Sequence, residues 1–163
     1  FDYVVCLEVI EHLGDPLALC RELRRVLRPG GRLLISTPNI LSLRSRIKFL
    51  LDGSFVFFNY PLIEWAQRDG RPSVHVHPIR VHELEYYLHQ AGFGIDTVFT
   101  NLRSYGWRLW LPLIWVIRLY AWHMVRRSRR PDRIPLDRIY ERILSDDVLY
   151  GTHLIVGARA GAR

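Results

Sequence analysis

The segment Phe1–Asn39 constrains the fold most, because an apolar stretch, a helical pattern and a second apolar stretch follow one another directly. Tyr3–Leu7 is apolar and partly β-branched without alternation, which is typical of a parallel strand buried on both faces. Asp15 and Pro16 then open a helix as N-cap and first helical residue. Glycine after Pro29 ends that helix, and Arg32–Thr37 predicts the next strand. A unit of this length is expected to form a right-handed βαβ crossover, and it predicts an α/β fold.

Two motifs in this unit carry a resemblance to a known family. The sequence L-E-V-I-E-H-L at residues 7–13, followed by L-R-P-G-G-R-L-L-I-S-T-P-N at 27–39, resembles strands four and five of class I S-adenosylmethionine-dependent methyltransferases. The branch with the ubiquinone-biosynthesis O-methyltransferases is the most similar, and the resemblance resumes at residues 82–93 and 151–159. It implies a Rossmann-like sheet made of strands four to seven, with the last strand antiparallel and inserted between strands five and six.

The resemblance also implies how the chain is divided. The family's glycine-rich loop and ribose-binding acidic residue should precede this sequence, and no G-x-G-x-G occurs in it. We therefore expect the C-terminal half of a methyltransferase, inactive as a fragment. Residues 1–102 and 147–163 would form the methyltransferase part. Residues 103–146 would be a basic, tryptophan-rich helical insertion, placed where the family has a short connection.

The predicted insertion concentrates the positive charge of the chain. Arg103–Arg142 holds ten arginines and three acidic residues, and this difference equals the whole net charge of +7. Its uninterrupted apolar run, Leu109–Ile117, is far shorter than the ~20 residues that a spanning helix requires. Tryptophans in Trp107–Val125, followed by an arginine cluster, favour an interfacial helix on an anionic membrane surface. The alternatives are a solvated arginine-rich face, or a helix packed on the protein's own sheet or on a dimer partner. The arginines of the cluster are Arg126, Arg127, Arg129 and Arg130.

Three polar residues follow the first predicted strand as E-x-x-E-H. In doubly wound sheets, ligands bind beyond the carboxyl ends of the strands. One helical turn would bring Glu8, Glu11 and His12 to the same side, and two carboxylates with an imidazole suit Mg²⁺ or a similar divalent ion. The alternative is that the glutamate caps the turn and the histidine packs.

The family resemblance adds residue roles to this motif. It implies that Leu7 contacts the methionine portion of S-adenosylmethionine, and that a histidine after strand five completes a metal site. His75 is the candidate, with His77 as the alternative. The ion would lower the pKa of the acceptor hydroxyl, or His12 or His75 could act as a general base. The expected ligands are Glu8, Glu11, His12 and His75.

Two further segments bear on the acceptor. Leu41–Asp52 predicts a helix with Leu50 and Leu51 inward and Arg46 outward. The aromatic stretch at 54–78 would be a lid over the substrate, as in the family, or a loop whose aromatic rings pack on the sheet.

These features together predict a class of enzyme. We expect S-adenosylmethionine-dependent O-methylation of a lipid, a quinone precursor or a membrane-linked glycan. The density of Trp, Leu and Ile in the insertion favours lipid over nucleic acid. The alternatives are a soluble small-molecule or RNA 2′-O-methyltransferase, or a non-catalytic membrane-associated module. Cys6 and Cys20 form no disulfide framework, which favours the cytoplasm, with peripheral binding to the inner face of the membrane.

Overall fold

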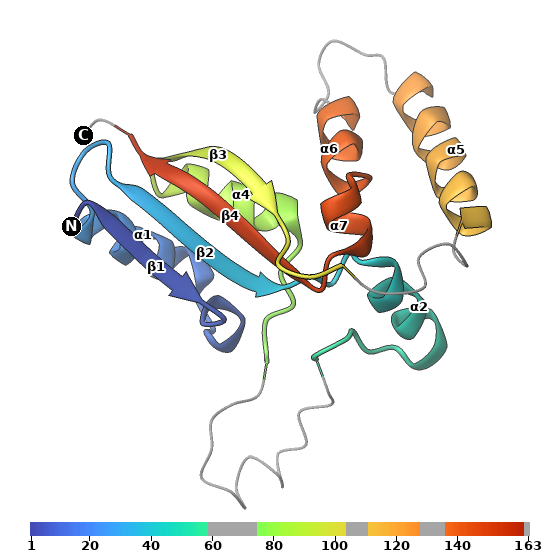
Figure 1. Cartoon of the computed structure of the whole chain (residues 1–163), viewed down its shortest axis with the longest axis horizontal. Helices are drawn as coiled ribbons and strands as arrows, with labels where there is room; N and C mark the ends of the chain where they lie inside the picture. The colour runs from blue at the N-terminus through green and yellow to red at the C-terminus, as the bar shows by residue number, and fades with distance from the viewer. Residues whose placement is uncertain (59–74, 104–110, 128–135, 162–163) are drawn as a thin grey trace, which may run out of the picture.

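The computed structural model describes residues 1–58, 75–103, 111–127 and 136–161. In these ranges, four strands form one sheet in the order β1-β2-β4-β3 (Figure 1). Strand β1 (Tyr3–Leu7) is parallel to β2 (Arg32–Pro38), and β4 (His153–Ala160) is antiparallel to both β2 and β3 (Phe93–Phe99). The position and direction of β4 confirm the sheet that the resemblance implies.

The βαβ unit forms as the sequence predicts. Helix α1 (Pro16–Val26) begins at Asp15, whose Oδ1 accepts a hydrogen bond from the Ala18 N–H at 2.9 Å. The turn after the helix uses Gly30 with φ 74°. A Cβ atom on Gly31 would lie 2.9 Å from the Leu27 side chain, so the turn leaves no room for one. This turn leads the chain directly into β2.

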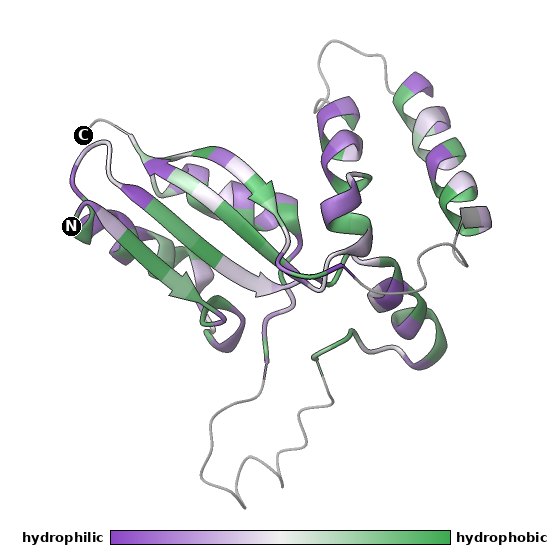
Figure 2. Cartoon of the chain, viewed as in Figure 1, coloured by the Kyte–Doolittle hydropathy of each residue, from purple (hydrophilic) through white to green (hydrophobic). Residues whose placement is uncertain are grey.

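The main core lies between one face of the sheet and two helices. Helices α1 and α4 (Val81–Gln90) both lie behind the sheet in Figure 1 and pack against it. Figure 2 shows that the central parts of β1, β2 and β4 are hydrophobic. The buried core side chains include Cys6, Leu33, Ile35, Val156 and Ala158 from the strands, and Cys20, Leu23, Leu84 and Leu88 from the helices.

The opposite face of the sheet is open. Tyr3, Val5 and Leu7 point away from α1 and α4, and each is between 52% and 67% exposed. The prediction that β1 is buried on both faces is therefore wrong, because α1 and α4 cover the same face. A hollow of about 350 Å³ lies on the sheet, lined by residues of all four strands, including Tyr3, Leu34, Thr97 and Gly157.

The predicted helical insertion lies between β3 and β4. It contains α5 (Leu111–Arg127) and α6 (Leu136–Ile143) and is followed by α7 (Asp146–Tyr150). An antiparallel bridge between Arg103 and Gly151 joins the start of the insertion to the residue that follows α7. The last strand starts at His153, two residues after the resemblance resumes at 151, since α7 extends to Tyr150. Trp107, Trp110, Arg129 and Arg130 lie outside the described residues.

Helix α2 (Leu43–Asp52) differs from the prediction at its second half. Leu43 is buried against Ile114 of α5 and Leu149 of α7, but Leu50 and Leu51 are 83% and 79% exposed. The helix packs against α5 and α7 only through its first turn, which explains why Leu50 and Leu51, predicted to face inward, are exposed. Arg46 was expected outward, yet its guanidinium donates to the Ile143 carbonyl at 3.2 Å, and burial lowers its pKa.

Candidate active site

The E-x-x-E-H segment follows β1 and begins with a residue in the left-handed backbone conformation. Glu8 has φ 53°, and its N–H donates to Ser36 on β2, at 3.3 Å to the carbonyl and 3.2 Å to Oγ. The chain then forms the short 3-10 helix η1 (Ile10–His12), in which Ile10 and Glu11 are buried. A positive φ is uncommon outside glycine and concentrates at functional sites. This geometry places Glu8 and Glu11 at the carboxyl edge of β1, where sheets of this class bind ligands.

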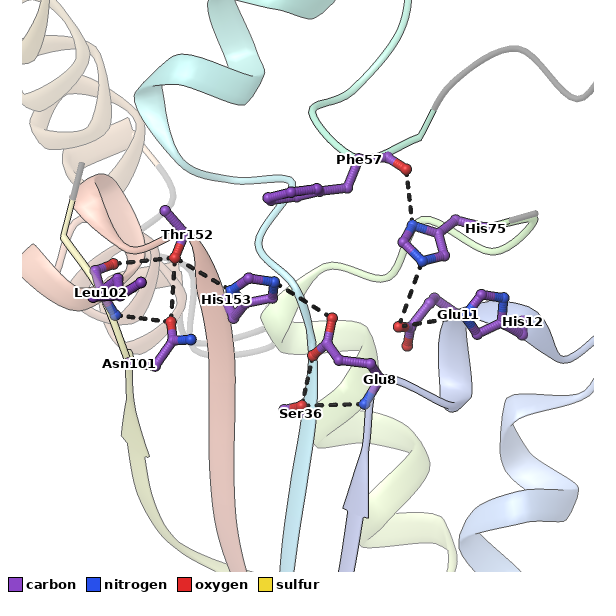
Figure 3. Close-up of polar contacts among 10 residues, drawn as sticks. All are labelled: Glu8, Glu11, His12, Ser36, Phe57, His75, Asn101, Leu102, Thr152 and His153. Carbon is purple, nitrogen blue, oxygen red and sulfur yellow. Dashed lines mark hydrogen bonds and ion pairs between the residues drawn. The ribbon is translucent and has the colours of Figure 1, made fainter. Parts of the chain in front are cut away.

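Glu11 is the centre of the first cluster of polar side chains. Its carboxylate is fully buried, and neither oxygen has a hydrogen-bond partner among the described residues. The Nε2 atoms of His12 and His75 each lie 3.9 Å from Glu11 Oε1 (Figure 3). The two imidazole rings meet edge to face, with centroids 4.6 Å apart. Burial raises the pKa of Glu11 and the nearby charge of Glu8 adds to this, whereas the backbone, the charge of His12 and the neighbouring Thr37 hydroxyl partly oppose the shift.

Main-chain hydrogen bonds bring His75 to Glu11 from far along the chain. The Glu11 carbonyl accepts the N–H groups of Val76 and His77, at 3.0 and 2.9 Å. His75 Nδ1 donates to the Phe57 carbonyl at 2.8 Å, since a carbonyl can only accept. In the neutral ring, Nε2 then turns a lone pair toward Glu11. Burial lowers the pKa of His75 and so favours this neutral form.

A carboxylate with two imidazole nitrogens close to it fits a divalent cation. Potential ligand atoms of Glu11, His12 and His75 all lie within 4.8 Å of one another. A buried carboxylate without a partner is unfavourable, and a cation at this point would neutralise it. Carboxylates suit Mg²⁺ and Mn²⁺, whereas imidazoles also suit first-row transition metals. The donor set therefore widens the choice of ion beyond the predicted Mg²⁺.

The structure gathers most of the predicted site residues at one edge. His75, and not its alternative His77, joins Glu11 and His12 in the cluster. Glu8 lies beside this cluster but is bound to other side chains. Leu7 ends β1 with its side chain exposed on the open face of the sheet. Of the predicted lid, residues 59–74 lie outside the described ranges.

Ser36 and His153, which sequence reasoning missed, complete the edge together with Phe57 from the predicted lid. Ser36 Oγ donates to Glu8 Oε1 at 2.6 Å, and His153 Nε2 lies 3.5 Å from Glu8 Oε2. The Phe57 ring stacks on His153 with centroids 5.1 Å apart, and Phe57 has φ 69°. One signal could have revealed His153, because an antiparallel strand begins where its parallel neighbours end.

The sheet and its polar edge define a class of protein, the class I S-adenosylmethionine-dependent methyltransferases. Residues 1–98, more than half of the chain, match the family described as "Methyltransferase domain". The chain belongs to this family. A solved S-adenosylmethionine-dependent methyltransferase from Archaeoglobus fulgidus shares the fold, with a TM-score of 0.50 and 17% identity, over 98% of this chain and 59% of that chain.

Within this class, the chain is similar to ubiquinone biosynthesis O-methyltransferases. The chain is 31% identical to a ubiquinone biosynthesis O-methyltransferase of Xylella fastidiosa (strain M23) over 108 residues. These aligned residues make up 66% of this chain and 40% of the relative. The ubiquinone biosynthesis O-methyltransferase of Xanthomonas oryzae pv. oryzae (strain PXO99A) is 51% identical over 39 residues, or 24% of this chain and 16% of the relative. The chain thus spans about two fifths of the length of the first of these relatives.

Proposed function

We propose that the protein containing this chain transfers a methyl group from S-adenosylmethionine to a hydroxyl oxygen, assisted by a divalent ion. The observation that carries the metal is the buried carboxylate of Glu11, which has two imidazole nitrogens 3.9 Å from one of its oxygens. Membership of the methyltransferase domain family supports the methyl transfer. The names of the curated relatives, which are O-methyltransferases, support oxygen as the methylated atom.

The chemistry assigns a task to each part of the edge. The acceptor oxygen forms a bond to the methyl carbon, the carbon–sulfur bond breaks with its electron pair going to sulfur, and the hydroxyl proton leaves to a base. S-adenosylmethionine supplies the methyl group on a positively charged sulfur, and Leu7 at the end of β1 is the proposed contact for its methionine portion. A divalent ion held by Glu11, His12 and His75 would supply positive charge that lowers the pKa of a hydroxyl. Either histidine is the candidate base if it does not hold the ion.

The acceptor class is proposed from helix α5. Its side chains Trp115, Leu119 and Trp122 follow one another at helical spacing and are all exposed, with Trp115 at 72%. The Arg126 guanidinium lies 4.0 Å above the Trp122 ring. Aromatic rings beside arginines favour the boundary between water and anionic lipid. We therefore propose a lipid, a quinone precursor or a membrane-linked glycan as acceptor.

Membrane binding in this proposal is peripheral. In the parts of the chain that the structure describes, no helix combines the length and the apolar character needed to cross a bilayer. Helix α5 would lie along the headgroups, with its buried side, including Ile114 and Ala121, toward the protein. The cytoplasmic face of a membrane supplies the anionic lipid that the arginines would contact.

The test uses the full-length protein that contains this chain, with labelled S-adenosylmethionine and catechol as a soluble acceptor with two neighbouring hydroxyls. We expect methyl transfer that EDTA suppresses and that added Mn²⁺ or Mg²⁺ restores. Glu11→Gln should lower this transfer strongly. Glu22→Gln, the same change on the exposed face of α1, is the matched control. Transfer that is indifferent to EDTA would refute the metal, and failure to bind S-adenosylmethionine would refute the methyltransferase.

A further inference from the structure

The two glutamates of the E-x-x-E-H motif lie in different surroundings. Both carboxylate oxygens of Glu11 are buried without a hydrogen bond. Glu8 has a partner on each oxygen, Ser36 Oγ at 2.6 Å on Oε1 and His153 Nε2 at 3.5 Å on Oε2. Figure 3 shows Glu8 pointing toward Ser36 and His153, whereas Glu11 points toward His75. The Glu8 carboxylate is thus hydrogen-bonded, whereas the Glu11 carboxylate has two imidazole nitrogens at 3.9 Å and the nearby Thr37 hydroxyl beside it.

His153 is itself fixed by its neighbours. Its Nδ1 lies 3.2 Å from Thr152 Oγ1, and the Thr152 hydroxyl is in turn within hydrogen-bond distance of the Leu102 carbonyl. The Phe57 ring stacks on its imidazole. A chain of polar contacts thus crosses the carboxyl edge from the end of β3, through the start of β4, to Glu8 and β2. The ring is held so that Nε2 faces the Glu8 carboxylate.

The backbone adds a further constraint on Glu8. Its left-handed φ of 53° and the hydrogen bonds from its N–H to Ser36 fix the Cα atom from which the side chain extends. Moving the carboxylate to an ion beside Glu11 would break the Ser36 hydrogen bond and the contact with His153. The buried Ser36 hydroxyl would then lose the acceptor of its proton, which is unfavourable.

We propose that His153 and Ser36 hold Glu8 outside the coordination sphere of the ion at Glu11, His12 and His75. His153 is then a positioning residue, and Glu8 is not the fourth protein ligand that its motif suggests. This leaves a partly exposed carboxylate beside the ion, where it can accept a hydrogen bond from the acceptor hydroxyl. The inference rests on the proposed metal site and adds a division of roles within it.

The first experiment compares the two glutamates by Mn²⁺ binding to the full-length protein, followed by electron paramagnetic resonance. Changing a residue that only supports a metal ligand typically weakens metal binding roughly 10–100-fold. Losing a ligand itself should cost at least as much, so we expect Glu11→Gln to weaken Mn²⁺ binding by that factor or more. Glu8→Gln should change the affinity less than about threefold. Equal losses in the two variants would overturn the inference alone. A wild-type protein that binds no Mn²⁺ would overturn the proposed metal site, and with it the division of roles.

The second experiment tests His153 with a double-mutant cycle. His153→Ala should release Glu8 toward the ion and tighten Mn²⁺ binding severalfold, and this gain should vanish when Glu8→Gln is also present. His153→Gln, whose amide can still donate near the position of Nε2, should keep the wild-type affinity. His89→Ala, on the exposed end of α4, is the control. Circular dichroism checks folding, and unchanged or weaker binding by a folded His153→Ala protein would overturn the role of His153.

Discussion

The carboxyl edge of the sheet and helix α5 depart from ordinary burial in opposite directions. At the edge, the charged side chain of Glu11 is fully buried without a hydrogen bond. On α5, large apolar side chains such as Trp115 and Leu119 are exposed. Buried carboxylates are rare and contiguous exposed apolar surface is uncommon in soluble domains, so each region is the basis of one proposal. The proposed partner is a divalent cation at the edge and an anionic membrane surface at the helix.

The largest effect should come from the edge. In the full-length protein, we predict that Glu11→Gln lowers turnover of catechol about 100-fold, because the substitution removes a proposed ligand of the metal ion. The pair Trp115→Ala with Trp122→Ala should leave turnover of this soluble acceptor within about twofold. Initial rates at saturating S-adenosylmethionine measure both. If the tryptophan pair also abolishes this turnover, the two regions do not act separately.

The second prediction reverses the comparison by measuring membrane binding. The pair Trp115→Ala with Trp122→Ala removes large apolar side chains from the exposed face, at about 25 cal/mol per Å² of lost burial. Binding to vesicles that contain phosphatidylglycerol should fall at least about tenfold, at low and at high salt alike. Co-sedimentation measures it, and Glu11→Gln should bind as wild type does. Wild-type protein that stays in the supernatant would contradict the membrane proposal, and unfolding of the tryptophan variant would identify α5 as core.

A smaller and salt-dependent effect should come from the end of α5. Arg126→Gln with Arg127→Gln removes two charges, each contributing about 1 kcal/mol near an anionic surface. The same vesicles should therefore bind roughly tenfold or more weakly at low ionic strength. At high salt the electrostatic attraction is screened, so the vesicle affinities of the variant and the wild type should converge. Arg44→Gln with Arg21→Gln, two exposed arginines on α2 and α1, is a charge-matched control. If the control variant loses as much vesicle affinity, the effect reflects the net charge of the protein and not the position of Arg126 and Arg127.

The smallest effect concerns the stability of the metal-free protein. Burial raises the pKa of Glu11 above its unfolded value, so its ionised form destabilises the fold at pH 7 and protonation removes that cost. We predict that Glu11→Gln stabilises the EDTA-treated protein by about 1 kcal/mol at pH 7. The gain should shrink as the pH falls through the raised pKa toward the unfolded value of ~4.3. Urea unfolding at several pH values measures this, and a gain that grows on acidification would contradict it.

Local patterns predicted the sheet and part of its edge well. Asp15, Pro16 and the glycines after Pro29 specify the βαβ unit within a short stretch, and neighbouring residues suffice to place it. The pairing of His75 with Glu11 required the family resemblance, because backbone hydrogen bonds between distant segments bring them together. Periodicity failed for Leu50 and Leu51, since it marks an apolar side of a helix but does not show where the helix leaves the core.

The role of Glu8 was beyond sequence reasoning for a related reason. The E-x-x-E-H spacing places its three polar residues at one strand end, but it does not reveal the orientation of each carboxylate. That orientation depends on Ser36 and His153, which belong to other strands. Strand order alone would have brought His153 to this edge, because β4 runs antiparallel to β2 and begins where β2 ends.

The bridge between Arg103 and Gly151 has an evolutionary consequence. The stretch between Arg103 and Gly151, which contains α5, α6 and α7, leaves and rejoins the sheet at adjacent points. Lengthening it therefore changes the entropic free energy of closure only by about 0.6 kcal/mol for each doubling. Descendants of one ancestor could exchange or resize that stretch while the final strand kept its register. The junction itself is less free, because a Cβ atom on Gly151 would lie 2.2 Å from the Asp147 carbonyl oxygen. Under the proposed function, new acceptors could thus be recruited by replacing the stretch between Arg103 and Gly151, while the carboxyl edge of the sheet was inherited intact.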